Sequence, residues 1–166
     1  MQPITEKKFV DDINCNMGII HKICNIYFVA PGAREDACQE ILYQLWKSYP
    51  AFKGDAKFST WMYKVALNTA ATYAKKSSRR LGKEIYPENI NQLAESNDQP
   101  RINDQMHFLY AAINELSVMD KAITLLYLED NSYDEIAAIT GITKTNVSVR
   151  LVRIKKSLKE KLKNII

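Results

Sequence analysis

The segment "SYDEIAAITGITKTNVSVRLVR", residues 132–153, limits the folds open to this chain more than any other part of its sequence. Ser132 stands three residues before Glu135, which is the capping-box pattern that begins a helix. Gly141 ends this short helix after about two turns. Ala137 lies four residues before the glycine, where two steeply crossing helices need a small side chain. Together these residues predict a helix-turn-helix.

The helix expected after this turn has an apolar stripe and a mostly polar outer surface. Thr143 can cap its first turn, and Ile142 can fill the space between the two helices. The stripe, with spacings of four, three, four and four, consists of Val147, Leu151, Ile154, Leu158 and Leu162. The outward positions are Thr145, Asn146, Ser148, Val149, Val152, Arg153 and Lys156. Such side chains suit the major groove of DNA, where hydroxyl groups bond bases or phosphates, Val contacts the thymine methyl and Arg forks onto guanine.

Charge is unevenly distributed along the chain, whose net charge is only +4. Residues 143–166 carry eight Lys or Arg and one acidic residue, whereas residues 104–142 carry one Lys and seven acidic residues. A basic block on a nearly neutral chain predicts a polyanionic partner for that block. The alternative is a solvated amphipathic helix, and for the lysines from Lys155 to Lys163 both interpretations stay open.

Helical spacing extends over most of the chain, in which Gly and Pro each occur only five times and few turns are available. We expect one helix over residues 4–29, a second over 34–49 after the breaker "APGAR", and a third with Ser59 as its N-cap. A long polar segment follows, which predicts a flexible linker. The expected fold is all-α, with two small helical domains, 1–81 and 104–166, joined by the linker 82–103.

Aromatic and cationic residues alternate in "FKGDAKFSTWMYKVALNTAATYAKKSSRR", which begins at Phe52. Aromatic rings can stack unpaired bases while Lys and Arg hold the nucleic-acid backbone. The alternative is that the rings belong to the core. For Trp61, Val65 and Tyr73, which lie roughly on one helical stripe, core packing is favoured. At Phe52 and Asn68 the residues alone leave both interpretations open.

The three cysteines, Cys15, Cys24 and Cys38, indicate reduced thiols in a cytoplasmic protein, because their number is odd and no CxxC pair occurs. His21, Cys24 and Cys38 could supply three zinc ligands, but a fourth is missing and core packing is favoured. We therefore predict no metal and no cofactor. No phosphate-binding glycine loop or nucleophile arrangement occurs, which disfavours an enzyme. No apolar run reaches the length of a membrane span, so no direct membrane insertion is expected.

Two long stretches resemble one protein family. "EDACQEILYQLWKSYPAFKGDAKFSTWMYKVALNTAATYAKKSSRR" resembles the second conserved region of bacterial extracytoplasmic-function (ECF) sigma factors, and "INELSVMDKAITLLYLEDNSYDEIAAITGITKTNVSVRLVRIKKSLKEKL" resembles their fourth region. With the first helix, the resemblance covers almost the whole chain apart from the linker. It implies a protein that is not an enzyme, binds core RNA polymerase at its clamp helices and flap, and directs it to promoters. It also implies an anti-sigma factor, commonly membrane-linked, that holds the protein inactive.

The resemblance assigns a role to each half. The second region melts the −10 promoter element and captures an unstacked base, at an unstacking cost of about a few kcal/mol. The matching positions for this step are Phe52, Lys53, Lys57, Lys64 and Asn68. Positions on the helix that meets the polymerase clamp are Asp36, Gln39, Glu40 and Trp46. The fourth region reads the −35 duplex, with base-reading positions at Ser148, Val149, Val152 and Arg153 and phosphate-reading positions at Arg150 and Lys156.

Two positions depart from the family pattern. Ser148 stands where many members have a basic residue, and Val149 stands where many have Ser. The sequence of the −35 element is therefore not predicted. The alternative function is a conventional helix-turn-helix transcription regulator that never enters polymerase. Such a regulator would carry a ligand-binding or dimerisation domain in its N-terminal half, rather than a segment rich in Trp and Lys.

Overall fold

The structure, a computed structural model, describes residues 3–81 and 104–164. Within these ranges all regular elements are helices, so the predicted all-α fold with two helical domains is confirmed. The chain divides into two compact units, Met1–Lys76 and Ser77–Ile166. The expected linker 82–103 lies outside the described residues, and the predicted domain boundaries stay predictions. None of the helices described combines the length and the apolar character that crossing a membrane requires.

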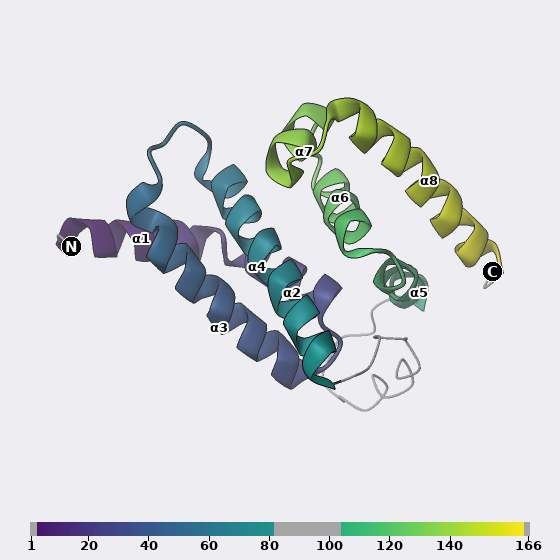
Figure 1. The fold of residues 1–166 in the computed structure, drawn as a ribbon, viewed down its shortest axis with the longest axis horizontal. Coiled ribbons are helices and arrows are strands. Elements are labelled where there is room, and N and C mark those ends of the chain that lie inside the picture. Colours follow the sequence, from purple (N-terminus) through teal and green to yellow (C-terminus); the bar gives the residue numbers. More distant parts are fainter. Residues whose placement is uncertain (1–2, 82–103, 165–166) are drawn as a thin grey trace. The chain divides into compact units, whose positions relative to one another are not determined.

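Helices of different lengths and one 3-10 turn build the first unit (Figure 1). They are α1 (Pro3–Cys15), α2 (Met17–Tyr27), α3 (Pro31–Ser48), the 3-10 turn η1 (Tyr49–Ala51) and most of α4 (Phe58–Leu81). The single helix expected over residues 4–29 is wrong, because the chain breaks at Asn16, with φ −122° and ψ 15°. The side-chain amide of Asn16 donates to the Asp12 carbonyl at 2.8 Å. Such local bonds let Asn compete with the helical hydrogen-bond ladder.

Two other helix starts differ from the expected ones. Helix α3 begins at Pro31, inside the segment interpreted as a breaker, because proline at the first helical position forfeits no hydrogen bond. Ser59 is not the N-cap of α4. The first helical hydrogen bond runs from the Trp61 amide to the Lys57 carbonyl at 3.1 Å. Helix α4 therefore begins at Phe58, and Ser59 lies in its first turn.

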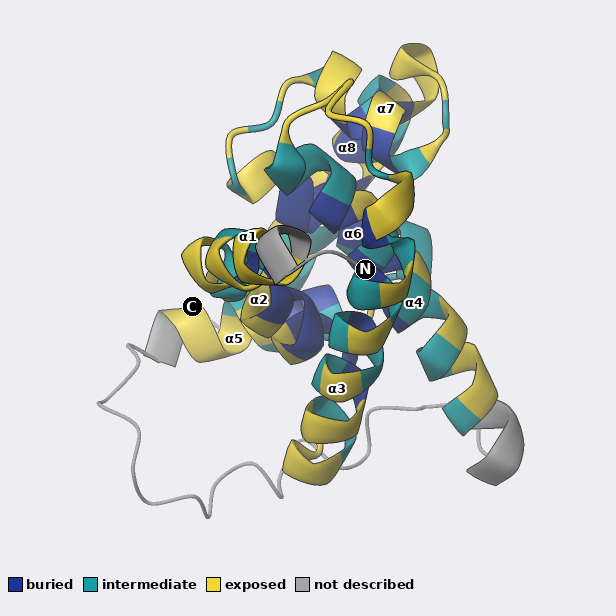
Figure 2. Ribbon diagram, turned by 90° about the vertical axis from the view of Figure 1, so that its left-hand side faces the viewer, coloured by how far each residue is buried: buried dark blue, intermediate teal, exposed yellow. Residues whose placement is uncertain are grey.

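The core of the first unit is formed by α2, α3 and α4. Its fully buried large side chains include Ile20, Ile23, Ile41, Leu45 and Met62. Helices α2 and α3 pack directly against each other. Farther along α4, the Tyr73 ring packs edge-on against Phe28, with 5.6 Å between ring centroids. Burial of these faces leaves the opposite sides of α3 and α4 in solvent, as the yellow and teal segments of Figure 2 show.

Aromatic side chains also connect α1, α3, η1 and the start of α4. This aromatic cluster consists of Phe9, Trp46, Tyr49, Phe52, Phe58 and Trp61. Tyr49 is its centre, since its ring lies 5.0–6.4 Å from four of the other rings. Several pairs meet edge to face, the geometry that aromatic quadrupoles favour. The cluster anchors the loop between η1 and α4 at both of its ends.

The second unit contains the helix-turn-helix. Its helices are α5 (Asp104–Asn114), α6 (Val118–Leu128), α7 (Tyr133–Thr140) and α8 (Lys144–Lys163). The Ser132 hydroxyl accepts from the Glu135 amide at 3.2 Å, and the Glu135 carboxylate accepts from the Ser132 amide at 2.8 Å. Gly141, with φ +78°, ends α7. The Thr143 hydroxyl accepts from the Asn146 amide at 3.1 Å. All three predicted caps of the α7–α8 pair are therefore confirmed.

Helix α8 packs against α5, α6 and α7 along its length (Figure 1). The predicted apolar stripe is confirmed, because Val147, Leu151 and Ile154 are buried and Leu158 and Leu162 are half-buried. Other fully buried side chains of this core are Ile113, Ile123, Leu126 and Ile136. One side of α8 is thus fixed in the core, and its other side lies in solvent.

Candidate nucleic-acid interface

The outer face of α8 combines small polar, cationic and exposed apolar side chains. Thr145, Asn146, Val149, Val152, Arg153 and Lys156 are exposed and Ser148 is half-buried. Val152 is 66% exposed and Val149 44% exposed, and both lie opposite the buried stripe. Exposed valines cost free energy in water but can contact thymine methyl groups in the major groove. The predicted −35 residues other than Arg150 thus lie on one surface, which we call the α8 outer face.

Arg150 lies apart from this surface. Its Nη1 donates to Asp120 Oδ1 in the first turn of α6 at 2.8 Å, and its Nε is buried without a hydrogen-bond partner. The expectation that Arg150 contacts DNA phosphate therefore meets a competing interaction, because the guanidinium is held on the inner flank of α8. The sequence contained no signal for this pair, since its two residues are separated by 30 positions.

Other cations of α8 also have partners within the unit. Lys144 pairs with Asp134 at 2.9 Å, and Lys161 pairs with Glu115. Lys155 Nζ donates to the Tyr127 hydroxyl at 2.9 Å, and this hydrogen bond raises the pKa of Lys155. In the ranges that the structure describes, Arg153 and Lys156 make no ion pair. These two cations of the α8 outer face are therefore best placed to bind a polyanion.

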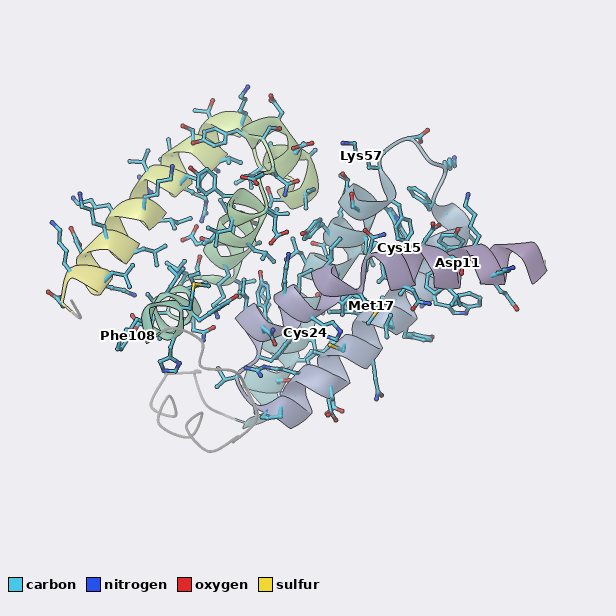
Figure 3. All side chains as sticks on the ribbon, turned by 180° about the vertical axis from the view of Figure 1, so that it is seen from behind. Asp11, Cys15, Met17, Cys24, Lys57 and Phe108 are labelled. Atoms are coloured by element: carbon cyan, nitrogen blue, oxygen red, sulfur yellow. The ribbon has the colours of Figure 1, made fainter. Side chains whose placement is uncertain are left out.

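A second cationic surface runs along α4 and the loop before it. Lys53, Lys57, Lys64 and Asn68 are all exposed. The last three are separated by seven and four residues, so they lie on one face of the helix. Figure 3 shows Lys57 where this loop enters α4. Gly54 turns the loop with φ +78°, a conformation that favours glycine. We call these residues the α4 outer face.

Phe52 differs from its neighbours because it is half-buried in the aromatic cluster. Its ring lies 5.1 Å from that of Trp61 and 5.7 Å from that of Phe58. Phe52 thus contributes to packing, and its role as a base-pocket residue stays a prediction. One face of the ring is used for packing, while its remaining surface stays accessible.

The predicted polymerase-binding residues lie on α3. Asp36 and Gln39 are exposed, whereas Glu40 is half-buried and accepts a hydrogen bond from Gln44 Nε2 at 2.9 Å. Trp46 is half-buried, and its ring meets the Phe9 ring edge-on at 5.0 Å. The structure does not place Trp46 on the same face as Asp36, since it turns toward α1.

One further exposed residue of α3 is not predicted from the sequence. Tyr43 is 56% exposed, seven residues after Asp36 and four after Gln39, so all three share one face, which together with Glu40 we call the α3 outer face. Its helical spacing from those residues is a signal that was available in the sequence. A large aromatic side chain exposed among polar residues is a frequent anchor of protein interfaces.

The cysteines lie in different surroundings. Cys24 and Cys38 come together across α2 and α3, with their sulfur atoms 2.9 Å apart, whereas His21 is exposed. In residues 3–81 and 104–164, no group of three or more His, Cys, Asp or Glu side chains could hold a metal ion. Burial, and then the hydrogen bond with Cys38, raises the pKa of the Cys24 thiol well above its usual range.

Comparison with known proteins finds related sequences for both units. Residues 13–80 match the sequence model of sigma-70 region 2, and residues 109–158 match that of sigma-70 region 4. The ECF RNA polymerase sigma-E factor of Escherichia coli strain K12 is 27% identical over 159 residues, which cover 88% of this chain and 83% of the relative. The sigma-E factor of Haemophilus influenzae is 27% identical over 148 residues, covering 79% and 75%.

Solved structures show the same fold. The sigma factor RpoE in complex with the anti-sigma factor NepR, from Bartonella quintana, superimposes with a TM-score of 0.72 at 20% identity, over 95% of this chain and 98% of that one. CnrH in complex with the cytosolic domain of CnrY gives 0.68 at 17% identity, over 96% and 90%. The two sequence models, over residues 13–80 and 109–158, define a two-unit, all-helical transcription factor of the sigma-70 class. Within that class, the chain belongs to the extracytoplasmic-function sigma factors, as its sequence motifs predicted.

Proposed function

We propose that this chain binds core RNA polymerase and directs it to a specific set of promoters. The observation that carries the proposal is that each helical unit matches a different sigma-70 region, and each presents an exposed cationic face there. Such a factor acts by binding, with no chemical step of its own, and works in the cytoplasm alongside the polymerase.

The second unit contacts the −35 duplex through the α8 outer face. Arg153 forks onto a base edge, Val149 and Val152 contact thymine methyl groups, and Lys156 neutralises phosphate. Exposure of these side chains beside a rigidly packed stripe supports this role, since a recognition helix must be held firmly while its outer residues enter the groove.

The first unit contacts both the −10 element and the polymerase. Lys57 and Lys64 bind phosphates of the opened strand, and Asn68 offers its amide to an unpaired base beside the accessible part of Phe52. Lys53 adds charge at the same end of α4. The α3 outer face, with Asp36, Gln39 and Glu40, contacts the polymerase clamp. The flap of the polymerase is the expected partner of the second unit.

An anti-sigma factor is the expected inhibitor. One structural neighbour was solved in complex with the anti-sigma factor NepR, and the other, CnrH, in complex with the cytosolic domain of CnrY. We propose that this chain is likewise held inactive by an anti-sigma factor, which the family resemblance suggests is membrane-linked.

Reconstituted transcription tests the proposed function. The purified chain is added to core polymerase of its own organism with a library of genomic promoter fragments, and start sites are mapped. Initiation at a defined promoter set, dependent on the chain, is the expected result. Duplex binding with no polymerase association would instead indicate a conventional helix-turn-helix regulator.

A further inference from the structure

Cys24 and Cys38 form a close pair inside the first unit. The Cys38 thiol donates to the Cys24 sulfur at 2.9 Å, from α3 to the neighbouring helix α2. A disulfide bond is ~2.05 Å long, so the sulfur atoms need to approach by only about 0.9 Å to be linked. Neither the DNA-facing surfaces nor the α3 outer face uses these two side chains.

Accessibility differs between the two thiols. Cys24 is 1% exposed, whereas Cys38 is half-buried and can be reached from solvent. Figure 3 labels Cys24 on α2 and Cys15 apart from it on α1. Cys15 is exposed. The structure thus provides one reachable thiol with a shielded neighbour, and one exposed thiol that can serve as a reference.

We propose that Cys24 and Cys38 are a redox modification site, at which a hydroperoxide converts the two thiols into a disulfide that links α2 to α3. In cytoplasmic proteins, disulfides are characteristically transient and redox-sensing rather than structural. The pair joins the helix that carries the proposed polymerase-binding residues to the helix beneath it. Cys38 is adjacent to Gln39 in the sequence. The disulfide therefore fixes this part of α3 to α2.

The chemistry balances with hydrogen peroxide as the oxidant. The Cys38 sulfur attacks one peroxide oxygen, the O–O bond breaks, and one water leaves, which yields a sulfenic acid on Cys38. The Cys24 sulfur then attacks the Cys38 sulfur, the S–O bond breaks, and the oxygen leaves as a second water with the Cys24 proton. Two thiols lose two electrons and two protons, and one peroxide becomes two waters. Cys24 is shielded from solvent whereas Cys38 is half-buried, so Cys38 is the thiol that meets the peroxide first.

Thiol counting in the full chain tests the proposal. The chain is treated with hydrogen peroxide, denatured, alkylated with N-ethylmaleimide and weighed by mass spectrometry. The reduced chain takes up label at Cys15, Cys24 and Cys38. After mild oxidation we expect label at Cys15 alone, a loss of two hydrogens from the peptide pair that contains Cys24 and Cys38, and full recovery with dithiothreitol.

Substitutions distinguish the mechanism from general oxidation. In Cys24→Ala, the Cys38 sulfenic acid has no resolving thiol, so dimedone is expected to trap it. In Cys38→Ser, Cys24 is expected to stay reduced and fully alkylatable at the same peroxide concentration. A Cys15→Ser chain should form the same disulfide and remain monomeric. Loss of the Cys24 thiol in Cys38→Ser, or disulfides found only between chains, would overturn the proposal.

A stability measurement provides a second readout. The linkage closes a loop between residues 14 positions apart, so the oxidised chain should unfold at a higher urea concentration than the reduced chain, as monitored by Trp fluorescence of the first unit. An unchanged or lowered midpoint would show that the bond distorts the packing of α2 on α3, which contradicts the geometry. Neither readout requires polymerase, so the outcome is independent of the proposed function.

Discussion

Arg150 of α8 donates a hydrogen bond from its Nη1 to Oδ1 of Asp120, 30 residues earlier in the first turn of α6, at 2.8 Å. Their side chains are 35% and 25% exposed, whereas those of the pair Lys144–Asp134, at 2.9 Å, are 60% and 73% exposed. Two ion pairs of similar length on one helix thus differ mainly in burial. Partial burial weakens solvent screening and makes the loss of one partner more costly.

The half-buried pair should therefore couple more strongly than the exposed one. In a double-mutant cycle, Arg150→Met and Asp120→Asn are expected to show about 1–2 kcal/mol of coupling in the opening free energy of α6 and α8, measured by amide hydrogen exchange. The matched cycle of Lys144→Met and Asp134→Asn should give below about 0.5 kcal/mol. Equal coupling energies in the two cycles would show that the difference in burial has no effect on these ion pairs. If Arg150 contacts a DNA phosphate instead, its replacement by Met should lower the salt dependence of DNA binding.

Arg153 should account for base recognition on the α8 outer face. Arg153→Ala is expected to weaken binding of the polymerase holoenzyme to a −35 duplex by about tenfold or more and to relax base preference at one position, because a bidentate contact is worth about 1–3 kcal/mol. Fluorescence anisotropy at fixed salt measures this. Lys159→Ala, an exposed cation on the same helix, is the control and should weaken all duplexes alike. If Arg153→Ala weakens binding to all duplexes equally, Arg153 binds a phosphate rather than a base.

Asn68 should act in strand opening rather than in polymerase binding. Asn68→Ala is expected to slow open-complex formation by about tenfold, equivalent to about 1.4 kcal/mol, because one amide contact to an unpaired base is lost. Permanganate reactivity of the −10 region follows this step. Thr72→Ala, one turn along the same exposed face, should have little effect. Loss of core binding in Asn68→Ala would show that Asn68 serves the polymerase interface.

On α3, replacing Tyr43 should affect polymerase binding, whereas replacing Trp46 should affect the stability of the first unit. Tyr43→Ala is expected to weaken core polymerase binding while leaving the urea midpoint unchanged, since the ring is 56% exposed. Trp46→Ala removes the edge-on contact with Phe9 and should cost about 2–4 kcal/mol of stability. Surface plasmon resonance with immobilised core measures the first effect, and urea unfolding the second. If Tyr43→Ala binds core polymerase with unaltered affinity, Tyr43 is not part of the interface.

Gly141 should be required for its backbone conformation alone. At φ +78°, an added Cβ would meet nothing within 4 Å, so the cost of Gly141→Ala is strain and not a clash. We expect a loss of about 1–2 kcal/mol in the stability of the α7–α8 pair, measured by hydrogen exchange of α7 amides. Gly141→Asn should lose less, because Asn tolerates the left-handed region better. Equal losses of stability in Gly141→Ala and Gly141→Asn would indicate that a side-chain contact, rather than backbone strain, causes the effect.

Most of the helix-turn-helix could be predicted from the sequence. The Ser132 cap, the Gly141 terminus and the buried stripe through Leu151 depend on residues three or four positions apart, which a helix brings together without help from the rest of the fold. The break at Asn16 was missed, although its cause is also local. Apolar residues continue at helical spacing on both sides of it, and that periodicity concealed the side-chain bond to Asp12.

The sequence alone determined that this chain is helical, that one helix presents a cationic outer face, and that its motifs are those of an ECF sigma factor. Tertiary structure decided which residues occupy those faces. The phosphate contact of Arg150 stays a prediction, but packing of α8 on α6 places its guanidinium beside Asp120, and Phe52 joins the aromatic cluster through Tyr49. Packing likewise brought Cys24 to Cys38. Helical periodicity assigns a residue to a face, but only the packing of distant helices determines what that residue touches.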